Sequence, residues 1–76
     1  MFLPGDDVKW VLSGEEGLGG WFYGRIKSCH PRGSGVYAGA ENAYCVVRVE
    51  KTPAVDSYLH FIDYSVPLTN RTLQLE

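Results

Sequence analysis

The sequence predicts an all-β fold of five short strands, and three observations point to it. Several segments rich in β-branched and aromatic residues alternate apolar and polar positions with a period of two, as half-buried strands do. Stretches rich in glycine and proline separate these segments at intervals of about 8–12 residues, the spacing of a small β domain. No stretch of a dozen residues has the 3.6-residue apolar period of a helix.

Length and composition limit the possible organisation of the chain. The 76 residues have room for one domain, 1–76, with one hydrophobic core, and 45% hydrophobic residues are typical of a folded globular domain. The net charge of −2 disfavours general nucleic-acid binding, because domains that bind nucleic acids are usually basic. The first residues contain neither a basic leader nor a long apolar run, so we expect no signal peptide, no membrane contact and a cytoplasmic location.

The strands are expected at residues 6–12, 20–29, 43–50, 57–64 and 72–75, with the alternation deciding which side chains face the core. The core-facing positions are Val8, Trp10 and Leu12, then Phe22, Gly24, Ile26 and Ser28, then Cys45, Val47 and Val49, then Leu59 and Phe61, and finally Leu73 and Leu75. A glycine within a strand often marks a bend or a close backbone approach, so the long second strand is expected to bend at Gly24. Five such strands with one short helical turn, near 65–69, before the last strand predict an SH3-like small barrel.

The cysteines and histidines predict no catalytic site, cofactor or metal. Cys29 and Cys45 are expected to stay reduced in the cytoplasm, and a disulfide between them remains possible if the protein is exported. The spacings of these cysteines and of His30 and His60 do not match those of a structural zinc site. The acidic pairs in the sequence are adjacent residues that point in different directions, which is poor geometry for acid/base catalysis.

Aromatic and basic residues gather on the outward side of the second strand and in the loop that follows it. The binding residues predicted from this pattern are Trp21, Tyr23, Arg25, Lys27, Arg32 and Tyr37. A loop over 30–42 that is rich in glycine is more often functional than idle. We therefore expect a non-enzymatic module that binds a protein or peptide. Nucleic acid is less favoured, because acidic residues at 6–7 and 15–16 would oppose a polyanion.

A second predicted surface is the outward side of strand 57–64. Its residues, Tyr58, His60, Ile62 and Tyr64, are too apolar for the surface of a monomer, which predicts a homo-oligomer, with a dimer favoured. Alternatively, the long loops cover these side chains. Self-association leaves an alternative function open: a small homo-oligomeric ligand-binding barrel or enzyme with its site at the subunit junction.

Three motifs resemble the Tudor and agenet domains of the SH3-like group. They are Gly5-Asp6-Asp7-Val8, Trp21 to Ile26 and Tyr44 to Val49, within a resemblance that covers roughly residues 3–50. The resemblance implies an aromatic cage for a methylated lysine or arginine. The corresponding positions are Leu12, Phe22 or Tyr23, Val49 and Thr52, and because only one of them is aromatic, methyl-lysine or methyl-arginine recognition is not favoured.

The same motifs have a looser similarity to the type II dihydrofolate reductases, which are short barrels that build one pore from four subunits. The segment 59–62 of this chain lacks the glutamine and the adjacent tyrosine of that family's pore-lining strand. The resemblance therefore implies that a barrel of this size can form a site by oligomerising, rather than implying the reductase activity itself.

Overall fold

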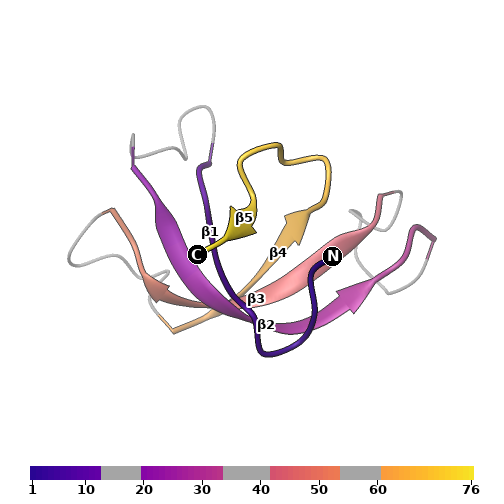
Figure 1. Cartoon of the computed structure of the whole chain (residues 1–76), viewed down its shortest axis with the longest axis horizontal. Coiled ribbons are helices and arrows are strands. Elements are labelled where there is room, and N and C mark those ends of the chain that lie inside the picture. The colour runs from indigo at the N-terminus through magenta and orange to yellow at the C-terminus, as the bar shows by residue number, and fades with distance from the viewer. Residues whose placement is uncertain (13–19, 34–41, 54–60) are drawn as a thin grey trace.

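The computed structural model describes residues 1–12, 20–33, 42–53 and 61–76. These residues form five antiparallel strands in one sheet, β1 (Asp7–Trp10), β2 (Phe22–His30), β3 (Tyr44–Lys51), β4 (Asp63–Pro67) and β5 (Gln74–Leu75). The strand order across the sheet is β4-β3-β2-β1-β5 (Figure 1). The predicted all-β class is therefore confirmed.

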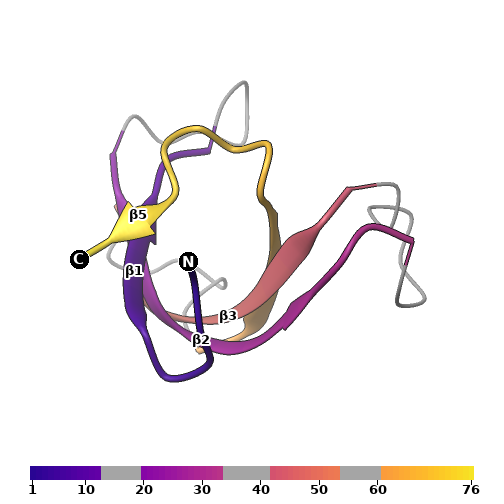
Figure 2. The ribbon, with the colours of Figure 1, turned by 45° about the vertical axis from the view of Figure 1, so that its right-hand side comes forward.

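The sheet is strongly curved, so that β1 and β5 lie on one side and β3 and β4 on the other (Figure 2). The two outermost strands, β4 and β5, are not paired with each other among the described residues, so full closure of a barrel stays a prediction. The turn between β4 and β5 is instead tied to the end of β1. The Oγ1 of Thr72 accepts the Val11 N–H at 2.8 Å, and the side-chain amide of Asn70 donates to the Val11 carbonyl at 3.1 Å.

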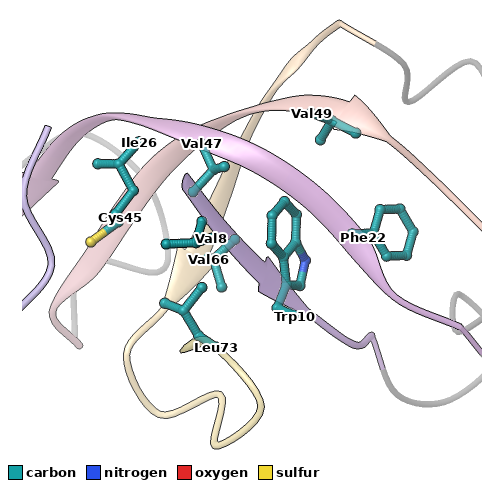
Figure 3. Packing of buried hydrophobic residues seen from close by; sticks show 9 residues of the cluster. All are labelled: Val8, Trp10, Phe22, Ile26, Cys45, Val47, Val49, Val66 and Leu73. Atoms are coloured by element: carbon teal, nitrogen blue, oxygen red, sulfur yellow. The ribbon is translucent and has the colours of Figure 1, made fainter. Parts of the chain in front are cut away.

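The core lies on the concave side of the sheet and is built from alternate residues of the strands. Its buried members are Val8, Trp10, Phe22, Ile26, Cys45, Val47, Val49, Val66 and Leu73 (Figure 3). Burial of each large apolar side chain contributes roughly 1.5–3 kcal/mol. The predicted core faces of the first three strands are thus confirmed, except that Leu12 and Ser28 are only partly buried.

Trp10 is the largest buried side chain, and it stacks on two other aromatic rings. Its ring centroid lies 5.7 Å from that of Phe22 and 6.5 Å from that of Tyr64. The indole Nε1 is buried without a hydrogen-bond partner among the described residues. Trp10 therefore stabilises the fold through its apolar contacts, at the expense of one desolvated N–H group.

β2 bends at two irregularities in its pairing with β3. The register shifts between Tyr23 and Gly24 and again between Ile26 and Ser28, as β-bulges do. The first shift skips Glu50 of β3 in the strand register, and the second skips Lys27 of β2. The bend predicted at Gly24 coincides with the first bulge.

The fourth strand differs from its prediction. It covers Asp63–Pro67 instead of 57–64, and its core-facing residues are Tyr64 and Val66, because they pair with the core residues Val47 and Cys45. Phe61 is not in the core as predicted: it is 67% exposed and has a φ of 64°, a left-handed conformation that interrupts the strand alternation. Leu59, Tyr58 and His60 lie outside the described residues.

The end of the chain also differs from its prediction. No helix is present in the described ranges, so the helical turn near 65–69 is not seen. Ser65 and Val66 instead continue β4, and two tight turns follow, with the Asn70 N–H bonded to the Pro67 carbonyl and the Leu73 N–H to the Asn70 carbonyl. Leu73 is buried as expected, but Leu75, at the end of a two-residue edge strand, is 55% exposed.

The expectation of reduced cysteines is wrong: Cys29 and Cys45 form a disulfide. The two residues are register partners on β2 and β3, with Cα atoms 4.1 Å apart, the close spacing of a narrow antiparallel pair. Their spacing in the sequence could not show this register, because the bulge next to Lys27 shifts it by one residue. Disulfides persist in oxidising surroundings, so the cytoplasmic location stays a prediction that this bond does not support.

Candidate functional site

The outer face of the sheet, opposite the core, brings together the aromatic and basic side chains predicted for binding. On this face, strand pairing places residues side by side in two rows that cross the sheet. The first row, from β5 to β3, is Gln74, Lys9, Tyr23 and Lys51. The second, from β1 to β4, is Asp7, Arg25, Arg48 and Asp63. We call these the aromatic row and the charged row.

Two lysines cover aromatic rings at the aromatic row. The Lys9 ammonium lies 4.7 Å from the ring centroid of Trp21, which directly precedes β2, and the Lys51 ammonium lies 5.3 Å from that of Tyr23. Both aromatic residues are partly buried. Cation–π pairs at exposed sites are worth about 0.5–1 kcal/mol, so a partner can displace either lysine at small cost.

Two exposed ion pairs hold the charged row. The Nε of Arg25 donates to Asp7 at 3.1 Å, and the Nε of Arg48 donates to Asp63 at 3.3 Å. The hydrogen bond to Asp7 and the charges of Asp7 and Glu50 raise the pKa of Arg25. Because the pKa of Arg25 is higher in the folded state, its positive charge stabilises the fold at every pH below the ordinary pKa of a guanidinium. This stabilisation is lost only at more alkaline pH. Arg25 therefore stays charged throughout the physiological range.

Both rows border a hollow of about 430 Å³ on this face. Its lining consists of Asp7, Tyr23, Gly24, Arg25, Glu50, Lys51 and Glu76. Acidic groups, basic groups and one aromatic ring line it together, so the hollow suits a ligand that carries both apolar and charged groups.

The other predicted binding residues do not all join this face. Lys27 is exposed on the bulge of β2, while Arg32 follows the opposite end of the nine-residue β2 from Trp21 and Tyr23. Tyr37 and most of the 30–42 loop lie outside the described residues. Prediction from sequence missed Lys9, Lys51 and Arg48, although the alternation within their strands placed Lys9 and Arg48 on the outward side.

The structure does not assemble the aromatic cage that the Tudor resemblance implies. Of its four positions, Phe22 and Val49 belong to the core and Thr52 is buried, so only Tyr23 presents an aromatic ring on the outer face. Leu12 packs against the core from the side.

A second cluster of polar side chains lies beside the disulfide. The Ser28 hydroxyl and the His30 Nε2 are 2.8 Å apart, and the His30 ring stacks on Tyr44 with centroids 4.9 Å apart. A nucleophilic serine also needs an acid that orients the histidine, and donors for the developing oxyanion. The described part of the chain places no acidic side chain in hydrogen-bond contact with His30. The cluster lies where β2 ends and β3 begins.

Within residues 1–12, 20–33, 42–53 and 61–76, no three histidine, cysteine or acidic side chains are grouped to hold a metal ion. Over the same ranges, no helix has the length and apolar character needed to cross a bilayer. Comparison of the chain with models of protein families, with curated proteins and with solved structures found no match.

Proposed function

We propose that this protein is a non-enzymatic binding module that recognises a protein or peptide partner through the outer face of its sheet. The observation that carries the proposal is the pair of aromatic rings at the aromatic row: Tyr23 lies on β2 and Trp21 directly precedes this strand, and a lysine ammonium lies over each ring. Aromatic side chains flanked by basic ones are typical of interface hot spots.

The charges of the face favour a peptide over a nucleic acid. Lys9, Lys51 and the two arginines of the charged row are interspersed with four carboxylates, from Asp7, Glu50, Asp63 and Glu76. A polyanion would approach these carboxylates at close range, whereas a peptide with acidic and apolar side chains can pair with the lysines and cover the aromatic rings.

The test is a titration followed by NMR, which separates the indole N–H of Trp21 from that of the buried Trp10. The probes are a short peptide of alternating acidic and apolar residues, a basic peptide of the same length and single-stranded DNA. We expect the acidic peptide to shift the Trp21 indole signal, and Tyr23→Ala to weaken this binding by about tenfold or more, the loss of a hot spot. The matched control is Leu68→Ala, which truncates an exposed apolar side chain that lies outside this face. Tight binding of the DNA that falls steeply with salt, without binding of the acidic peptide, would overturn the proposal.

We also infer that the chain forms a homodimer through the outer edge of β4. Among the described residues this strand ends the sheet, and Phe61 and Ile62, which are 67% and 39% exposed, lie directly before it. A strand edge flanked by exposed apolar side chains favours pairing with a second copy of the chain. Tyr64, which was expected on the outward side of this strand, is partly buried against the core, and a ligand site at the subunit junction remains the alternative function.

We further infer that the curved sheet belongs to the SH3-like small barrels. The support is the strand order, which ends in β4 and β5, together with the hydrogen bonds that join the turn between these strands to Val11 of the β1 end. Side-chain and turn contacts, rather than a fifth strand pairing between β4 and β5, would then close the barrel.

A further inference from the structure

The charged row places two positive side chains directly opposite each other. Arg25 of β2 and Arg48 of β3 are register partners, and both are exposed on the outer face. Register partners in an antiparallel pair have Cβ atoms about 4.5–5.5 Å apart, and like charges at this spacing destabilise the sheet. The sheet therefore carries an electrostatic cost at its centre that a bound negative group would relieve.

Each arginine is held from the outer side of the row. Arg25 donates through Nε to Asp7 on β1, and Arg48 donates through Nε to Asp63 on β4. A guanidinium carries five N–H donors, and among the described residues neither arginine has another hydrogen-bond partner. The two ion pairs thus position the side chains and leave most of their donors for a ligand.

We propose that Arg25 and Arg48 together form an oxyanion subsite that binds a carboxylate of the partner peptide. This inference rests on the proposed function, and it deepens it by assigning the chemistry of one contact. A carboxylate has two oxygens that match the planar donors of guanidinium groups, and charge-assisted bonds of this kind are among the strongest in proteins.

The neighbouring acids select a group with a single negative charge. Asp7, Asp63 and Glu50 lie on the same face, and they would repel a phosphate dianion more strongly than a carboxylate. The carboxylate belongs either to an aspartate or glutamate side chain or to the C-terminus of the partner. The chemistry is the same for both sources, and the experiment distinguishes them.

The experiment follows the arginine Nε–Hε signals of the whole chain by NMR during titration with acetate, at ionic strength held constant with chloride. We expect saturable shifts at Arg25 and Arg48. Arg48→Gln should weaken acetate binding, measured at Arg25, by about tenfold, the loss of a charge-assisted hydrogen bond. Asp63→Asn, which releases Arg48 from its carboxylate, should tighten it. Arg71→Gln, an exposed arginine in the turn after β4, is the matched control and should have no effect.

Inorganic phosphate and two short peptides complete the test. One peptide has a free C-terminus and no acidic side chain, and the other has an aspartate and an amidated C-terminus; the tighter binder identifies the source of the carboxylate. Equal shifts at Arg71, or phosphate binding tighter than acetate, would overturn the subsite. If peptide binding at Trp21 is unchanged by Arg48→Gln, the subsite fails while the proposed function stands. If acetate binds but no peptide does, the proposed function fails and the anion site alone remains.

Discussion

Gly24 of β2 lies directly against the backbone of Arg48 on β3. A β-carbon at Gly24 would be 2.6 Å from the Val47 Cγ1 and closer still to the carbonyl oxygen of Arg48. Only glycine fits this bulge, which bends β2 and sets the register that places Arg25 beside Arg48.

Gly24→Ala should therefore destabilise the protein by at least the 1–3 kcal/mol typical of overpacked cores. Urea unfolding measures the difference. Gly33→Ala is the control, because a β-carbon there meets no neighbour among the described residues and only its positive φ of 81° is unfavourable, at about 1–2 kcal/mol. If Gly24→Ala lowered the free energy of unfolding by no more than Gly33→Ala does, the close approach of β2 and β3 would be contradicted.

Reduction of the Cys29–Cys45 disulfide should lower the free energy of unfolding by about 3 kcal/mol, because the bond closes a loop with a sequence separation of 16 residues. The measurement is denaturant unfolding with and without a reducing agent. The double variant Cys29→Ala/Cys45→Ala provides the control, since its stability should not respond to the reductant. A wild-type protein equally insensitive to reduction would show that the bond is absent in solution.

Thr72→Val keeps the shape of the side chain but removes the hydroxyl that accepts the Val11 N–H. This N–H is partly buried, and leaving it unpaired should cost about 1–3 kcal/mol. Thr69→Val in the same turn is exposed, and its effect should stay within about 0.5 kcal/mol. Thermal unfolding of both variants distinguishes them, and similar midpoints would mean that the turn is not anchored to β1.

Ile62→Lys should convert the proposed dimer to monomer, because it places a charge beside the outer edge of β4. Sedimentation velocity at high micromolar concentration measures the change. Leu68→Lys alters another exposed apolar residue at the opposite end of β4 and should leave the dimer intact. Wild-type protein that sediments only as a monomer would exclude self-association.

The period-two alternation predicted the core of the first three strands. Val8 and Ile26, for example, each lie between two charged residues in the sequence. The prediction for segment 57–64 failed because apolar residues lie on both of its faces. Without a contrast between them, the alternation could not show that Tyr64 rather than Phe61 faces the core.

The other features that could not be predicted from the sequence depend on strand register. The neighbours in the charged row and the disulfide pair both depend on how β2 and β3 align, and the two bulges shift that alignment. Bulges arise from close backbone packing at positions such as Gly24. The alternation of apolar and polar residues along the sequence carries no information about this packing. The outward residues of each strand could be predicted, but not which of them become neighbours.

The pairing of Val8 with Leu75 joins residues near the two ends of the chain, and the Glu76 N–H bonds to the Asp7 carbonyl. During synthesis, β1 therefore has no partner on its β5 side until residues 74–75 have left the ribosome. The hairpin of β2 and β3 can form earlier from contacts closer in sequence, whereas β5 pairs with β1 across all the intervening strands of the sequence. Because such distant contacts slow folding, the rate at which this protein reaches its native state should depend on the two shortest strands of the sheet.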